Sequence, residues 1–135
     1  MSAFIFKTEP STYSWGDLVR NRRATWDGIS NATALIRLRT VRKGDDVVIY
    51  HTGGEKRAVG LARATSAAYA DPKLDDPKRV VVDIAPERAF ESPVSLAAFR
   101  ADALLAKTDL VRISRLSVVP LSAEQLKRVL KLAAG

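Results

Sequence analysis

A tryptophan occupies a polar turn in the segment Trp26-Asp27-Gly28-Ile29-Ser30-Asn31. The Asp27-Gly28 pair favours a turn, and glycine allows another group to come close to the backbone. Asn31 carries a donor and an acceptor, which together can read the edge of a base beside an exposed aromatic ring. The segment therefore predicts a ligand-binding turn. The alternative is that Trp26 simply anchors the loop to the core.

Two further groups could take part in acid–base chemistry. His51, the only histidine, lies in Tyr50-His51-Thr52 and could be a general base. No partner nucleophile is identifiable, which favours a structural, hydrogen-bonding role for this histidine. Lys7 and Glu9 are expected on one face of a strand as a solvated ion pair, and the alternation of side chains points Thr8 away from them.

The chain is strongly basic. It has 22 lysine and arginine residues against 15 aspartate and glutamate residues, a net charge of +7 over 135 residues. This bias favours polyanionic partners, nucleic acid first, although solubility explains the charge equally well. Arg115 could hold a phosphate or carboxylate, or close the sheet through a salt bridge. The expected phosphate contacts are Arg20, Arg22, Arg23, Arg39, Arg42 and Lys43.

Several kinds of chemistry are excluded by what the sequence lacks. It has no cysteine, and one histidine cannot make a multi-histidine metal site. A glycine-rich phosphate loop and a serine nucleophile elbow are also absent. Redox and phosphoryl-transfer enzymes are therefore not expected, and neither a metal nor a cofactor is predicted. No signal peptide or membrane span is recognisable, so we expect a cytoplasmic protein.

The chemically interesting residues must be positioned by a mixture of strands and helices. Capping residues at 14, 31, 95 and 122 predict four helix starts, the last in a Ser122–Gln125 capping box. Gly44 is expected to end the second helix, and residues 70–77 to form a loop. Strands are predicted at 4–9, 47–52, 58–65, 79–84 and 116–120, and helices at 15–20, from 31 to about 42, at 96–105 and after 122.

The order of these elements predicts the fold class. Strands and helices are mixed without a regular βαβ repeat, which argues for a single α+β domain over residues 1–135. We expect a curved, largely antiparallel sheet with helices packed on it. A small, partly closed barrel would remove the exposed sheet edges.

Five motifs, in this order, resemble the EVE domain family, which includes the thymocyte nuclear protein-like proteins and belongs to the PUA-like superfamily. The resemblance covers essentially the whole chain and implies a PUA-like fold, a small mixed β-barrel flanked by helices. The motifs are Lys7-Thr8-Glu9-Pro10, the segment from Trp26 to Asn31, Gly44-Asp45 followed by Tyr50-His51-Thr52, Val59-Gly60-Leu61-Ala62, and Arg115-Leu116-Ser117-Val118.

The resemblance also implies a function. EVE domains are similar to YTH domains, which hold a modified base in an aromatic-lined pocket, so the chain is expected to bind a modified base in DNA or RNA without catalysing a reaction. Trp26 would be half exposed and stack on the base, while Asn31 would read its polar edge. The residues expected at the pocket are Lys7, Glu9, Trp26, Gly28, Ser30, Asn31, Tyr50, His51, Arg115 and Ser117.

The sequence also departs from the family pattern and leaves two other functions open. Ser30 and Ala32 replace a usual arginine and tyrosine, and a usual tryptophan is replaced near Arg79. One alternative is a small hydrolase of modified nucleosides that uses residues 7–9, with the pKa of Lys7 lowered by desolvation. The other is a basic domain that binds a protein through a large apolar patch. The chain is expected to be a monomer whose downstream activity comes from a partner protein.

Overall fold

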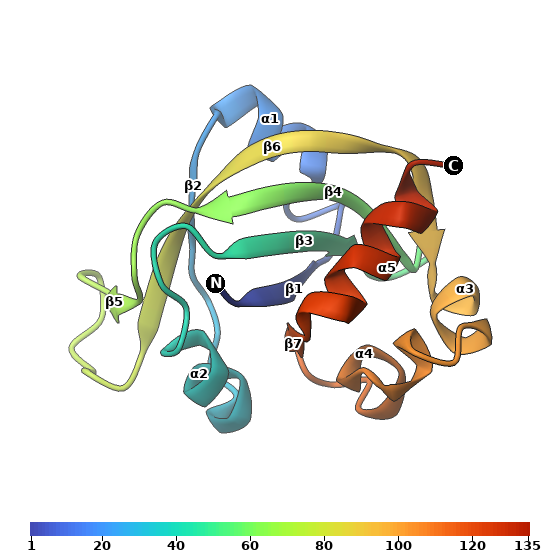
Figure 1. Ribbon diagram of the computed structural model, residues 1–135. Helices are drawn as coiled ribbons and strands as arrows, with labels where there is room; N and C mark the ends of the chain where they lie inside the picture. Colours follow the sequence, from blue (N-terminus) through green and yellow to red (C-terminus); the bar gives the residue numbers. More distant parts are fainter.

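The computed structural model describes residues 1–135 as seven strands, five α-helices and a short 3-10 helix (Figure 1). The strands are β1 (Ala3–Thr8), β2 (Ala24–Trp26), β3 (Asp46–His51), β4 (Arg57–Ala64), β5 (Tyr69–Ala70), β6 (Val80–Ser95) and β7 (Val118–Leu121). The helices are α1 (Trp15–Asn21), α2 (Ala32–Leu38), α3 (Leu96–Ala101), α4 (Asp109–Arg112) and α5 (Ala123–Ala133), with the 3-10 helix at Leu105–Lys107. No helix is both long enough and apolar enough to cross a membrane.

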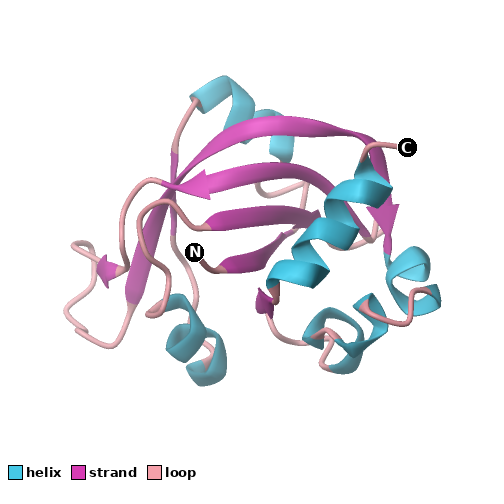
Figure 2. Cartoon of the chain, in the orientation of Figure 1, coloured by secondary structure: helices cyan, strands magenta, loops and turns pink.

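The strands form one mixed sheet in the order β2-β6-β4-β3-β1-β7, with β5 paired to β6. The β1–β3 pair is parallel and the other pairs are antiparallel. Figure 2 shows the sheet curling into a half-barrel with helices around it. The predicted α+β class and the largely antiparallel sheet are therefore confirmed.

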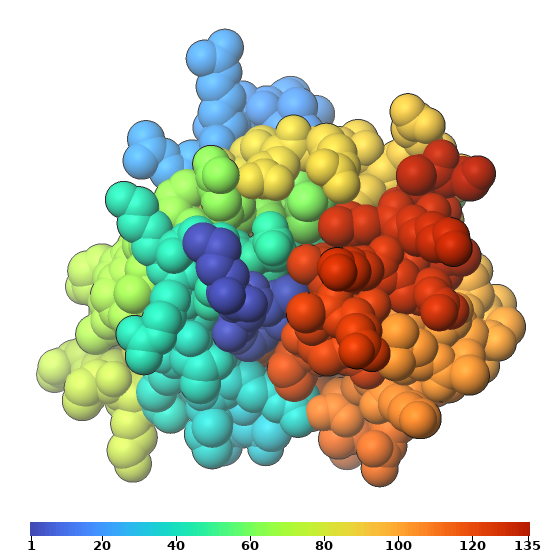
Figure 3. All heavy atoms as spheres, in the orientation of Figure 1, coloured from blue at the N-terminus to red at the C-terminus, as the bar shows by residue number.

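Strand β1 lies between β3 and β7 and has core on both of its faces. Phe4 and Phe6 belong to one apolar cluster, and Ile5 belongs to a second. The expected alternation along β1 is thus confirmed. Figure 3 shows the start of the chain packed between the segment around residues 40–50 and the C-terminal helix, and the backbone N–H of Ser2 donates to Oδ1 of Asp45.

The four predicted helix caps are confirmed. Each cap side chain accepts a hydrogen bond from the backbone N–H three residues later, and two of the four make full capping boxes. The capping residues are Ser14, Asn31, Ser95 and Ser122.

The predicted end of the second helix is wrong, because α2 stops at Leu38. The hydroxyl of Thr40 donates to the carbonyl of Arg37, so a side chain competes for a helix carbonyl just where the helix would continue. Gly44 does not cap α2. It lies in the turn entering β3 with φ of 95°, and its N–H donates to Ala64.

Several elements were missed because their signals are weak or contradictory. Strand β6 continues to Ser95 through two prolines, and its pairing with β4 shifts register at Ala62, opposite Pro86. The three residues of β2 are too few and too polar to read as a strand. The helix expected to run to residue 105 ends at Ala101, because Oδ1 of Asp102 accepts from the N–H groups of Leu104 and Leu105.

Gly60 of β4 provides a testable constraint on this packing. A Cβ at Gly60 would lie 2.7 Å from three atoms of the Trp15 indole, whereas one at Gly54 would meet nothing within 4 Å. We expect Gly60→Ala to lower the free energy of unfolding by about 1–3 kcal/mol, because the ring must shift. Gly54→Ala is the matched control and should change it little. Urea unfolding measures both, and equal stability of the two variants would contradict the packing.

Candidate functional site

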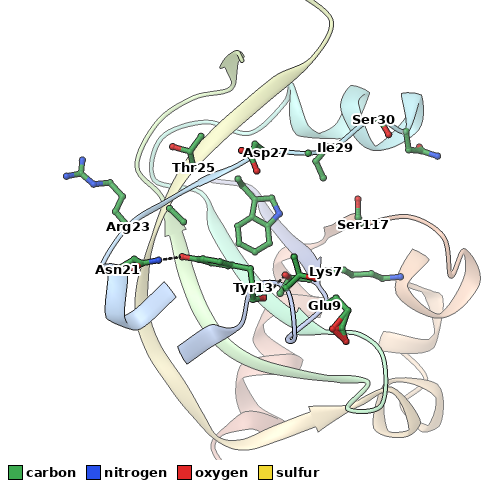
Figure 4. A pocket seen from close by; sticks show the side chains of 16 residues that line it. Lys7, Glu9, Tyr13, Asn21, Arg23, Thr25, Asp27, Ile29, Ser30 and Ser117 are labelled. Carbon is green, nitrogen blue, oxygen red and sulfur yellow. Dashed lines mark hydrogen bonds between the residues drawn. The ribbon is translucent and has the colours of Figure 1, made fainter. Parts of the chain in front are cut away.

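A pocket of about 770 Å³ opens beside the end of β1 (Figure 4). Its size is typical of sites for small molecules. Three parts of the chain line it: the end of β1 with the turn that follows, the segment from the end of α1 through β2 to the cap of α2, and Ser117 ahead of β7. Figure 4 shows Lys7, Glu9 and Ser117 on one side of the pocket and Asn21 and Arg23 on the other.

Most of the residues expected at the pocket are there, although their roles remain predictions. The structure brings together residues that are far apart in sequence, from β1, from the turn after β2 and from the loop before β7. The residues placed as expected are Lys7, Glu9, Trp26, Gly28, Ser30, Asn31 and Ser117. The three that do not line it are Tyr50, His51 and Arg115.

Tyr50 is buried on the other side of the sheet. It is 3% exposed and belongs to the second apolar cluster, whereas its neighbour Ile49 packs in the cluster that contains Trp26. Neighbouring residues of a strand point to opposite faces, so Tyr50 cannot share a wall with Trp26. The prediction that it lines the pocket is wrong. Its burial also raises the pKa of its phenol.

His51 has a structural position that supports the start of α1. Its Nε2 accepts a hydrogen bond from the backbone N–H of Trp15 at 2.9 Å, which places the ring proton on Nδ1. Nδ1 then donates to Oε1 of Glu55, also at 2.9 Å. This hydrogen bond lowers the pKa of Glu55, with help from Arg57. With both nitrogens engaged and the ring buried, His51 fits the structural alternative and not a pocket role.

Trp26 is both a core residue and a pocket residue. It is 8% exposed and pairs with Val82 of β6, so the expectation of a half-exposed loop residue is wrong. The ring centroids of Trp26 and Phe6 are 5.8 Å apart, and the two planes are inclined by 33°. The indole therefore joins β2 to β1 across the inside of the curled sheet while lining the pocket.

Tyr13 is the pocket residue that sequence reasoning missed. Its ring meets the Trp26 indole in a T-shaped arrangement, with centroids 6.0 Å apart and planes at 80°. Its hydroxyl accepts a hydrogen bond from Nδ2 of Asn21 at 3.0 Å (Figure 4). A signal was present, since Tyr13 is an aromatic residue in a polar turn just before a helix, as Trp26 is. The same argument applied to Tyr13 would have found the second aromatic wall.

Asn31 can offer only part of the polar pattern expected of it. Its Oδ1 accepts from the backbone N–H of Ala34 at 3.0 Å, as the cap of α2. The carbonyl of the amide is therefore engaged, and the side chain presents its Nδ2 donors to the pocket.

Lys7, Thr8 and Glu9 all line the pocket but do not form a catalytic group with one another. Lys7 Nζ donates to the carbonyl of Ser114 and the Thr8 hydroxyl to the carbonyl of Tyr13, both at 2.7 Å. Glu9 accepts from the N–H and hydroxyl of Ser11. The expected Lys7–Glu9 ion pair is absent, because each side chain has found a nearer partner.

The first basic cluster lies at the pocket. Arg23 lines it and Figure 4 shows its side chain extending outward, while Arg22 is exposed at the C-terminal cap of α1. Arg20 pairs with Asp17. In the pocket lining, Lys7 and Arg23 balance two acidic residues, so the lining has no excess charge.

The second basic cluster is at the wrong end of α2. Asn31 at the pocket caps the N-terminus of α2, and Arg39 caps its C-terminus and donates to the carbonyl of Lys78. Arg42 follows in the loop, and Lys43 lines a separate cavity with Met1. The expectation that this cluster borders the pocket mouth is therefore wrong. The expected salt bridge of Arg115 is also absent, because this residue is exposed in the turn before β7.

The environment of Lys7 predicts a measurable titration. Burial lowers the pKa of the Lys7 ammonium, as expected from the sequence. Because the folded pKa is lower than the unfolded one, the charged form costs stability, and this cost disappears as the pH rises from the folded to the unfolded pKa. We expect NMR titration of the Lys7 Cε to have its midpoint below the usual lysine range in the folded protein and within it in urea. Equal midpoints in the two states would contradict the burial.

Comparison with known proteins agrees with the motifs. The EVE domain family model matches residues 2–132. Thymocyte nuclear protein 1 of Danio rerio is 29% identical over 135 residues; the match covers 83% of this chain and 58% of that protein, so the chain spans less than two thirds of its relative.

Two solved structures share the whole fold. A protein from Rhodopseudomonas palustris, solved by NMR, is 36% identical with a TM-score of 0.93, over 98% of this chain and 93% of that one. The crystal structure of human THYN1 protein in complex with 5-methylcytosine containing DNA is 25% identical with a TM-score of 0.90, over 100% and 99%. The half-barrel is thus the PUA-like fold that the motifs implied, and the chain belongs to the EVE domain family.

Proposed function

We propose that this domain binds a modified base in DNA or RNA and acts by binding, not by catalysis. The observation that carries the proposal is the pocket of about 770 Å³ walled by two aromatic side chains, Tyr13 and Trp26. Aromatic walls with polar groups at the edge suit a base removed from its stack. The complex of human THYN1 protein with 5-methylcytosine containing DNA supports this ligand class.

The energetics favour a single strand over an intact duplex. Taking one base out of the duplex costs a few kcal/mol, which a single-stranded or mismatched site avoids in large part. One extra methyl group contributes only about 0.8 kcal/mol on burial, less than tenfold in affinity. Strong discrimination therefore needs the polar groups of the pocket, which lose hydrogen bonds when the wrong base enters.

The hydrolase alternative has little support in the geometry. A nucleophile needs a base within hydrogen-bonding reach, and residues 7–9 direct their polar atoms to other partners. The protein-binding alternative requires a large apolar patch. Large exposed apolar side chains instead occur on several different elements, such as Val19 on α1, Ile36 on α2 and Leu132 on α5.

The direct test is binding of single-stranded oligonucleotides with and without 5-methylcytosine. We expect tighter binding of the modified strand. Tyr13→Leu should remove about 1–3 kcal/mol of binding because an aromatic wall is lost, while Tyr13→Phe keeps the ring and should bind like the wild type. Trp26→Ala is a poorer probe, because removing a core ring costs about 3–5 kcal/mol of stability. Equal wild-type affinity for modified and unmodified strands, with other modified bases also tested, would contradict the proposal.

The two basic clusters predict different salt behaviour. Changing both Arg22 and Arg23 to alanine removes two charges beside the pocket; changing Arg42 and Lys43 removes two at the far end of α2. We expect the first pair to weaken binding to all sequences and to lower the salt dependence by about one to two phosphate contacts. The second pair is the matched control, with a smaller effect. An equal loss from the second pair would place the phosphate path elsewhere.

A further inference from the structure

The indole N–H of Trp26 is a donor without a partner. This N–H makes no hydrogen bond in the protein, yet the structure has no fully buried side-chain nitrogen or oxygen that lacks a partner. The Trp26 nitrogen must therefore reach solvent, although only 8% of the residue is exposed. Since Trp26 lines the pocket, the small exposed part of the side chain includes a hydrogen-bond donor.

This donor is held rigidly. Phe6 and Tyr13 pack against the indole, with ring centroids 5.8 and 6.0 Å from it. The backbone of Trp26 pairs with Val82 of β6, which fixes the direction in which the side chain leaves the strand. A donor fixed in this way loses little freedom on binding, so its hydrogen bond contributes to selectivity more than that of a mobile surface group.

Two neighbouring groups also present donors. Asn31 has its amide oxygen engaged at the cap of α2, which leaves Nδ2. Lys7 has no carboxylate within salt-bridge distance, and only one of the three ammonium hydrogens is used, by the carbonyl of Ser114. The pocket therefore holds several donors that lack a protein acceptor.

We propose that the indole N–H of Trp26 donates a hydrogen bond to an acceptor on the bound base, either a ring nitrogen or a carbonyl oxygen. This inference rests on the proposed function and makes Trp26 a specificity-determining residue as well as an aromatic wall. A base that presents an N–H at this point leaves the Trp26 donor unpaired and desolvated, which lowers affinity by about tenfold or more.

The sharpest test reads the indole signals of the wild-type protein. The chain has only two tryptophans, Trp15 and Trp26, and Trp15 does not line the pocket. On addition of a single-stranded oligonucleotide with one 5-methylcytosine, we expect the Trp26 indole proton to move downfield in an ¹⁵N-correlated spectrum and to exchange more slowly with water. The Trp15 signal serves as the internal control and should stay in place. An upfield shift at Trp26, typical of a base stacked over the ring, would overturn the inference.

A variant separates the donor from the ring. Trp26→Phe keeps an aromatic side chain in the core but removes the N–H, and its loss of one indole signal also assigns the spectrum. We expect about tenfold weaker binding of the same oligonucleotide, with Tyr13→Phe as the control that loses a polar group but no aromatic ring. Unchanged affinity of a folded Trp26→Phe would overturn the inference. If this variant does not fold, the wild-type spectrum still decides.

The outcomes distinguish the inference from the function beneath it. Failure of the wild type to bind any modified strand would overturn the proposed function and this inference with it. Binding of the modified strand with an unmoved Trp26 indole signal would overturn only the role of the donor.

Discussion

The indole of Trp26 packs against Phe6, although their strands are far apart in the sheet. Strand β2 is at one edge, and β6, β4 and β3 separate it from β1. The two rings come within 5.8 Å because the sheet curls, so their contact closes the inside of the half-barrel. Burying large aromatic side chains in this way contributes about 1.5–3 kcal/mol each. The same contact fixes one wall of the pocket, so the core and the site depend on one piece of packing.

The opposite wall depends on residues that never reach the pocket. Tyr13 and Asn21 flank α1, and the start of α1 is held by the hydrogen bond from Trp15 to His51. Trp15 in turn fits against β4 only because Gly60 has no side chain. The Tyr50-His51-Thr52 motif therefore supports the site from behind the sheet. This arrangement separates the residues that shape the pocket from those that face a ligand.

The polar groups of the site suit recognition more than reaction. Thr8 and Glu9 direct their oxygens to nearby groups of the chain, and Asn31 uses its amide oxygen to cap α2. These bonds hold the turns around the pocket in place. The groups left free include the Trp26 indole N–H and the amide nitrogen of Asn31, which can hydrogen-bond a base but cannot abstract a proton from it. A pocket with such groups discriminates between bases by pairing or failing to pair.

The sequence by itself determined the features whose signals are local. The four caps could be predicted because a serine or asparagine side chain bonds a backbone N–H only three residues away. The burial of both faces of β1 and the family were also readable, because alternation and ordered motifs are written along the chain. These features together led to the α+β half-barrel and to most of the pocket residues.

The tertiary structure decided what depends on pairing between distant segments. Tyr50 follows Ile49 and faces the other side of the sheet, and only the position of β3 in the sheet determines which side holds the pocket. Strand β2 exists because β6 pairs with it, since its three residues carry no strand signal of their own. The two basic clusters look alike in sequence, but the early end of α2 and its direction leave one of them away from the pocket. In each case the deciding contact joins residues too far apart for any local pattern to report.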